Sequence, residues 1–218
     1  MSDPEELHDH DEAEHEGIHK GGLPYYGKRV MALEALLEEK GILTKDEIQQ
    51  LIDQTDSVSP KNGAKVVARA WVDPEYKARL LSEPKKTLEE SGYGELPEDP
   101  VIVVVENNDD VRHLVVCTLC SCYPRALLGR PPDWYKSLAY RSRAVDDPRG
   151  VMKEFGQHVP DSVEVRVLDS TADIRYLVVP QRPEGTEGWS EDELVKLVTR
   201  DSMIGASEPL KPEQVPAG

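Results

Sequence analysis

The stretch Val111-Arg-His-Leu-Val-Val116 runs directly into Cys117-Thr-Leu-Cys120-Ser-Cys122, which holds every cysteine of the chain. The first segment is rich in β-branched residues, which predicts a buried strand. The cysteines then follow on a loop at the end of that strand, where main-chain amides remain free for ligation. Because such closely spaced thiols rarely meet the separation and direction that a disulfide requires, we expect the loop to bind a metal.

The spacing of the cysteines suits chelation by sulfur and main-chain nitrogen together. If the amides of Ser121 and Cys122 lose their protons, these nitrogens and the sulfurs of Cys120 and Cys122 can close three fused chelate rings in one plane. The Cys117 sulfur would cap that plane and leave one position open, as Lewis-acid catalysis requires. A structural zinc site is the alternative, with His113 as a fourth ligand. Spacing alone leaves catalysis and a redox or structural use equally open.

The cysteine loop and its flanks, Val116 to Pro124, resemble the metal-binding signature of the α subunit of nitrile hydratase in its cobalt form. The resemblance covers about Tyr25 to Gly205. Outside the loop it is carried by Gly63-Ala-Lys-Val-Val67, Ala70-Trp-Val-Asp-Pro-Glu-Tyr76, Leu128-Gly-Arg-Pro-Pro-Asp-Trp-Tyr135, Tyr140-Arg-Ser-Arg143, Asp169-Ser-Thr, Arg175-Tyr, Arg182-Pro-Glu-Gly-Thr-Glu-Gly-Trp189 and Val198-Thr-Arg-Asp-Ser-Met-Ile-Gly205.

This resemblance implies a non-corrin, low-spin Co(III) ion, one per subunit. Its ligands would be the sulfurs of Cys117, Cys120 and Cys122 and the main-chain nitrogens of Ser121 and Cys122. In the family, the residue matching Cys120 is a sulfinic acid and the one matching Cys122 a sulfenic acid, while Cys117 remains a thiolate. Thr118 and Tyr123 resemble the cobalt enzymes, so cobalt is favoured over Fe(III).

The activity that the resemblance implies is hydration of a nitrile to its amide, with Cys122 as nucleophile or base. Asp169, Ser170 and Arg175 match a segment that braces the metal loop. In the family a β subunit supplies two arginines to the oxidised sulfurs, so the chain would be active only with that subunit, as an α2β2 heterotetramer. Cobalt insertion would need an activator protein.

Two departures from the family pattern affect the expected substrate. Arg125 stands where most relatives have Trp, as in thiocyanate hydrolase, and a guanidinium near the open position would favour an anionic or polar substrate. Alternatively, Arg125 points away and pairs with the partner subunit. Upstream, Glu98-Asp-Pro replaces a Gln-Gly-Glu segment. The metal-binding subunit of thiocyanate hydrolase is therefore a second candidate function.

A noncatalytic cobalt or zinc carrier is a candidate of another class, because the acidic N-terminus contains four histidines, His8, His10, His15 and His19. A net charge of −16 without clustered Lys and Arg argues against nucleic-acid binding. There is no apolar run long enough to span a membrane and no signal-peptide pattern, so a cytoplasmic location is expected. Hydrophobic residues make up only 38% of the chain, with a single Phe, as expected of a subunit that completes its core against a partner.

Periodicity and capping signals predict four parts. They are a disordered acidic tail over 1–23, a helical arm over 24–92, an α+β metal-binding domain over 93–206 and a loose tail over 207–218. The resemblance implies that the arm contacts the β subunit. The resemblance implies a layered α-β-β-α arrangement for the domain. The predicted helices are 25–40, one from the capping box at Thr44, 64–71, one from the N-cap Asp73 to before Gly92, a short one after Pro132, 148–155 and one from the capping box at Ser190 through Val198. The predicted strands are 101–105, 111–116, 163–167 and 174–179.

Overall fold

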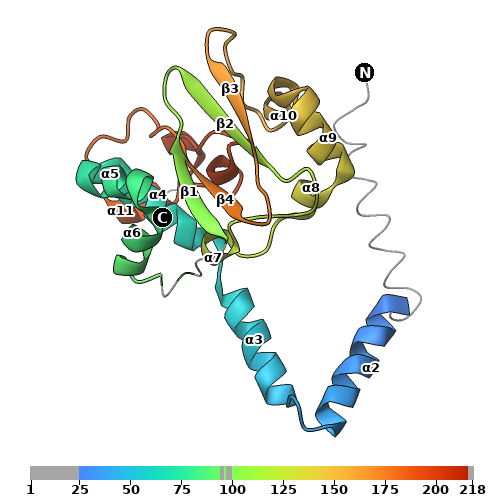
Figure 1. Ribbon diagram of the computed structural model, residues 1–218. Helices are drawn as coiled ribbons and strands as arrows, with labels where there is room; N and C mark the ends of the chain where they lie inside the picture. Colours follow the sequence, from blue (N-terminus) through green and yellow to red (C-terminus); the bar gives the residue numbers. More distant parts are fainter. Residues whose placement is uncertain (1–24, 94–95, 97–99, 216–218) are drawn as a thin grey trace. The chain divides into compact units, whose positions relative to one another are not determined.

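The computed structural model describes residues 25–93, 96 and 100–215, which form helices and four strands as the α+β prediction expected (Figure 1). The chain divides into two units on either side of Ser57 and Val58, and each is described by itself. The predicted disordered tail, with its four histidines, and Glu98 lie outside the described residues. None of the described helices is both long and apolar enough to cross a bilayer.

The N-terminal unit consists of two helices, α2 (Tyr25–Glu39) and α3 (Lys45–Ser57). The predicted capping box opens α3: the Glu47 amide donates to Thr44 Oγ1 at 3.2 Å, and the Thr44 amide donates to Glu47 Oε2 at 2.8 Å. Neither helix buries a residue within the chain. The large apolar side chains left exposed in this unit are Tyr25, Tyr26, Val30, Met31, Leu33, Leu36, Ile42, Leu51 and Ile52. Because short helices depend on packing for most of their stability, these two helices lack their usual main source of it in this unit.

The second unit begins with three helices, α4 (Pro60–Val72), α5 (Pro74–Ser82) and α6 (Pro84–Glu90). The predicted cap of α5 is confirmed, since Asp73 Oδ1 accepts a hydrogen bond from the Tyr76 amide at 2.9 Å. The prediction of one continuous helix from Asp73 to Gly92 was wrong. Pro84 lacks the amide that would continue α5, so the chain turns and begins α6 there.

Two pairs of parallel strands form the centre of this unit. Strand β1 (Val101–Glu106) pairs with β4 (Ile174–Val179), and β2 (Val111–Val116) pairs with β3 (Glu164–Asp169). The short segments 107–110 and 170–173 reverse the chain between the pairs. The carboxyl ends of β2 and β3 therefore lie at the same end as the amino ends of β1 and β4. The cysteine loop follows β2 at that end.

Further helices and turns from several parts of the sequence complete this unit. They include α7 (Arg125–Leu128), α8 (Asp133–Lys136), α9 (Leu138–Asp146), α10 (Pro148–Glu154), α11 (Glu191–Val195) and the 3-10 turns η1 (Ser202–Ile204) and η2 (Pro212–Gln214). Helix α9 packs on β2 and α10 on β3, while α5 and α6 pack on β1. Sequence patterns missed α7 and α9, and α11 ends earlier than the predicted Val198.

The core of the second unit is one large apolar cluster, with a small satellite formed by Ala68, Leu194 and Leu197. Trp189 packs against the satellite and is partly buried. Its indole lies next to α11, whose capping box at Ser190 is also confirmed. Leu210 and Val215 pack there too, so the chain remains in contact with the core beyond Gly205.

The turn at Gly205 presses directly on strand β2. Gly205 has φ +77°, and a Cβ at this position would lie 1.7 Å from the carbonyl oxygen of His113. Both the backbone conformation and the space therefore require glycine. This contact fixes the segment after η1 against the strand that precedes the cysteine loop.

We expect Gly205→Ala to lower the free energy of unfolding by about 3 kcal/mol or more, because the methyl group must displace the β2 backbone. Gly188→Ala is the matched control: Gly188 also has positive φ, at +80°, but a Cβ added there would meet nothing within 4 Å. The control should lose only about 1 kcal/mol. Urea unfolding of both variants measures the difference, and equal losses would contradict the close contact.

Candidate metal centre

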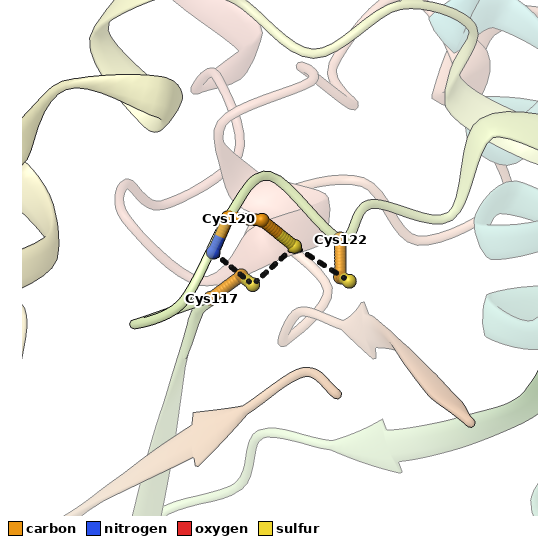
Figure 2. A group of neighbouring side chains, drawn as sticks. All are labelled: Cys117, Cys120 and Cys122. Atoms are coloured by element: carbon orange, nitrogen blue, oxygen red, sulfur yellow. Dashed lines mark hydrogen bonds between the residues drawn. The ribbon is translucent and has the colours of Figure 1, made fainter. Parts of the chain in front are cut away.

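The three cysteine sulfurs point toward one another from the loop that follows β2 (Figure 2). Cys117 Sγ lies 3.4 Å from Cys120 Sγ, which lies 3.2 Å from Cys122 Sγ. The three ligand atoms all fall within 4.8 Å of one another. All three cysteines are free rather than disulfide-bonded. Three soft sulfur donors so close together are a ligand set for a transition metal.

The main chain of the loop curls around the Cys120 sulfur. The Cys120 amide donates to Cys117 Sγ at 3.2 Å, which closes the first turn. The amides of Ser121 and Cys122, which the sequence predicts as ligands, belong to the same loop and contribute to the lowered pKa of the Cys120 thiol. The three convergent sulfurs fit the transition metal that the spacing suggested.

The three thiols differ in exposure and acidity. Cys117 and Cys122 are buried, whereas Cys120 is exposed. Hydrogen bonds, first from the Cys122 thiol, then from Cys117 and the Ser121 amide, lower the pKa of Cys120 to about 7. Burial raises the pKa of Cys122 to about 12, although the charge of Arg175 acts in the opposite direction. In the metal-free chain, Cys120 therefore ionises before Cys122.

Asp169 ties the loop to the neighbouring strand. Parallel pairing places Asp169 opposite Val116, the last residue of β2. Its carboxylate accepts hydrogen bonds from the Thr118 amide at 3.0 Å and the Thr118 hydroxyl at 2.6 Å. Ser170 is buried, and its amide donates to the Val116 carbonyl at 2.7 Å. These bonds fix the first turn of the loop at the edge of the sheet.

Two buried tyrosines donate hydrogen bonds to main-chain carbonyls of the cysteine loop and of the strand before it. The Tyr135 hydroxyl donates to the Cys122 carbonyl at 2.9 Å, and the Tyr140 hydroxyl donates to the Val115 carbonyl at 2.6 Å. Tyr135 also packs edge-on against Tyr123, with ring centroids 5.1 Å apart. Sequence analysis did not assign these tyrosines to the site. The cluster of aromatic residues soon after the cysteines was the available signal, but only the fold shows which carbonyls they reach.

A cavity of about 430 Å³ opens beside the sulfurs. Its described lining consists of Pro100, Ile102, Cys120, Ser121, Cys122, Tyr123, Pro124, Arg125, Ala126 and Arg175. Ile102 and Arg175 are partners in the β1–β4 register, so the cavity lies where this strand pair begins and β2 ends. A small molecule in the cavity would contact Cys120 and Cys122 as well as two arginines.

The predicted site residues are thus brought together around one loop. The cysteines and Ser121 form its centre, Arg125 and Arg175 line the cavity, and Asp169 binds the loop directly. His113, proposed as the fourth ligand of a zinc site, lies outside the sulfur group. Its ring Nδ1 is 3.0 Å from Asn107 Oδ1, and its amide donates to the same oxygen at 2.9 Å. Among the described residues, only the three cysteines group as candidate metal ligands.

Comparison with protein families gives a match to "Nitrile hydratase, alpha chain" over residues 25–207. Among curated proteins, the chain is 51% identical over 193 residues to the high-molecular weight cobalt-containing nitrile hydratase subunit alpha of Rhodococcus rhodochrous, covering 87% of this chain and 94% of that subunit. It is also 40% identical over 189 residues to thiocyanate hydrolase subunit gamma of Thiobacillus thioparus, covering 82% of this chain and 78% of that subunit.

Solved structures give the same two groups. A double histidine mutant of the Fe-type nitrile hydratase from Comamonas testosteroni Ni1 matches with a TM-score of 0.80 and 43% identity, covering 88% of this chain and 94% of that chain. A recombinant thiocyanate hydrolase with partially modified cobalt centres matches with a TM-score of 0.82 and 38% identity, covering 90% of this chain and 95% of that chain.

Metal-free protein should be alkylated first at Cys120, because this thiol is exposed and its pKa is lowered to about 7. Labelling with iodoacetamide at pH 8, followed by peptide mass spectrometry, measures the order. The rate at Cys120 should fall roughly tenfold for each pH unit below its pKa. Urea-unfolded protein is the control, in which all three thiols should react at similar rates. Faster labelling of Cys117 or Cys122 in the folded chain would contradict this arrangement.

Asp169→Ala should loosen the first turn of the loop. Both bonds from Asp169 to Thr118 are exposed, so we expect a loss of about 1 kcal/mol, or roughly fivefold faster hydrogen exchange at the Thr118 amide. Asp161→Ala, in the exposed turn before β3, is the control and should leave this amide unchanged. Unaltered exchange in Asp169→Ala would show that the carboxylate does not hold the loop.

Proposed function

The chain belongs to the nitrile hydratase α-chain family, and on this basis we propose that it is the metal-binding α subunit of a cobalt nitrile hydratase. The reaction adds one water to a nitrile and yields the corresponding amide. The observation that carries this proposal is the convergence of three cysteine sulfurs on one loop beside an open cavity. Thr118 and Tyr123, together with the cobalt-containing relative, favour cobalt over iron.

The proposed ligands are the sulfurs of Cys117, Cys120 and Cys122 and the main-chain nitrogens of Ser121 and Cys122, holding one Co(III) per subunit. We further propose that Cys120 becomes a sulfinic acid and Cys122 a sulfenic acid. When bound, the ion supplies a Lewis acid that polarises the nitrile. Cys122 contributes to the cavity lining, so an oxygen on its sulfur would face the substrate and act as the nucleophile or base.

The surrounding residues hold this group in place. Asp169 keeps the first turn closed through Thr118, while Ser170 joins the end of β2 to the segment after β3. Tyr135 fixes the Cys122 carbonyl, which prevents rotation of the peptide that follows the reactive sulfur. Arg175 places a positive charge near Cys122 and would stabilise an anionic oxidised sulfur.

A β subunit is the proposed partner, and the exposed apolar side chains of α2 and α3 support it. Helices that bury nothing within their own chain have a surface suited to another subunit. We propose an α2β2 heterotetramer in which the arm predicted over 24–92 contacts β. We also propose that the complex is located in the cytoplasm and that an activator protein inserts its cobalt. We also propose that the predicted domain, 93–206, has the layered α-β-β-α arrangement of the family, leaving 207–218 as a tail.

The metal-binding subunit of thiocyanate hydrolase is the second candidate. Arg125 lines the cavity, and the thiocyanate hydrolase subunit is 40% identical to this chain. That reaction consumes thiocyanate and two waters and releases carbonyl sulfide, ammonia and hydroxide. A noncatalytic metal carrier differs from both candidates because its metal would exchange and its thiols would stay unoxidised.

Coexpression with a β subunit in cobalt medium tests these candidates. We expect tightly held cobalt, two added oxygens on Cys120 and one on Cys122 by peptide mass, and an amide from a panel of nitriles. Cys122→Ser should lower kcat by about a thousandfold or more, since it removes the proposed nucleophile or base and one ligand. Cobalt-free medium is the control. Carbonyl sulfide from thiocyanate without any amide would favour the second candidate, and exchangeable metal with unmodified thiols would favour the carrier.

A further inference from the structure

A second cavity lies at the opposite end of the strands from the cysteine loop. Asn107 directly follows β1 and Pro180 directly follows β4, and both line a cavity of about 530 Å³. Because β1 and β4 are parallel, this cavity lies where their carboxyl ends meet. Ligands of parallel sheets commonly bind outside such ends. The cysteine loop follows the carboxyl end of β2, so the carboxyl ends of β1 and β4 offer a further place for a ligand.

Asn107 contributes a hydrogen-bond donor of fixed orientation to the lining of this cavity. Its side chain is buried, and its Oδ1 accepts a hydrogen bond from the His113 amide at 2.9 Å. Because a main-chain N–H can only donate, this bond fixes which end of the Asn107 side chain carries the oxygen. The other end, Nδ2, makes no hydrogen bond with any described residue. This NH2 group is therefore available to a ligand.

Gln157 contributes an unpaired acceptor from a different element. Gly156 ends α10 with φ +82°, and the Gln157 amide donates to the Met152 carbonyl at 2.9 Å, which fixes the main chain in a Schellman turn. The Gln157 side chain is only 2% exposed and lines the cavity. Its Oε1 is buried and has no hydrogen-bond partner among the described residues. Because a buried oxygen without a donor is unfavourable, a ligand that donates to it would be stabilised.

The charged side chains of the lining leave these two groups unpaired. Arg112 and Arg182 both donate to main-chain carbonyls, and Asp109 accepts a hydrogen bond from Gln181 at 2.7 Å. The other charged side chains of the described lining are exposed, namely Glu184, Glu208, Lys211 and Glu213. The buried polar side chains of this lining are therefore two neutral amides, one with an unused donor and one with an unused acceptor.

We propose that this cavity binds a primary carboxamide, whose carbonyl accepts a hydrogen bond from Asn107 Nδ2 and whose NH2 group donates to Gln157 Oε1. A primary carboxamide carries both a donor and an acceptor and has no charge, as these two side chains require. The inference goes beyond the proposed function, because binding in this cavity involves none of the proposed metal ligands. A primary amide is also the product of the proposed reaction, so the chain would carry a second site for its own product.

The test titrates propanamide against the complex with its β subunit, prepared with and without cobalt, and follows binding by saturation-transfer NMR. We expect saturable binding in both preparations. N,N-dimethylpropanamide keeps the carbonyl but lacks the N–H donors, so it should bind about tenfold more weakly. In the cobalt-free complex, Gln157→Met keeps the size of the side chain but removes the acceptor, and should weaken propanamide about tenfold and abolish the difference between the two amides. Gln54→Met, at an exposed position of α3, is the matched control and should change neither.

Three results would overturn the proposal. Absence of saturable binding would show that the cavity holds only water or is filled by β in the complex. Equal affinity for the two amides in the unaltered complex, a comparison that requires no variant to fold, would show that the cavity does not recognise the N–H donors. Unchanged propanamide binding in Gln157→Met would place the ligand elsewhere. None of these measurements depends on hydration of a nitrile, so their failure is distinct from failure of the proposed function.

Discussion

The parallel pairing of β2 with β3 is the constraint on which the rest of the site depends. Its register sets Asp169 opposite Val116, one residue before the first cysteine, so the carboxylate meets the amide and hydroxyl of Thr118. This contact fixes the direction in which the loop leaves β2. The three cysteine sulfurs lie close together in the residues that follow. A shift of one residue would turn Asp169 to the other face of the sheet and leave the loop without this support. Gly205 strengthens the arrangement, because its contact with His113 holds β2 from the other side.

One part of the site is buried and hydrogen-bonded, and another part is exposed. Tyr135 and Tyr140 are buried and bind carbonyls on either side of the cysteines, while Cys120 and Arg125 remain exposed. Buried hydrogen bonds of this kind limit the motion of the loop that holds the three cysteines. The exposed face carries the charge that a partner or a substrate would meet. The N-terminal unit also leaves a surface exposed, because α2 and α3 are regular helices that bury no residue within the chain.

Much of the fold and the centre of the site were predictable because their signals are local. Strand composition, the capping boxes at Thr44 and Ser190 and the cap at Asp73 depend on residues within four positions of one another, and each was confirmed. The misses have equally local causes. Pro84 splits a helix that apolar periodicity alone made continuous, and α9 lies in a stretch of mixed polarity whose burial comes from packing on β2.

The sequence by itself determined that the three cysteines would come together, because all of them lie within six consecutive residues. Only the tertiary structure decided what surrounds that group. The pairing of strands more than fifty residues apart brings Asp169 to the loop and Arg175 to the cavity, and a helix after the loop returns Tyr135 to the Cys122 carbonyl. Such contacts have no fixed spacing along the chain. They arise from the burial of apolar strand and helix faces, which is a property of the whole fold rather than of any segment.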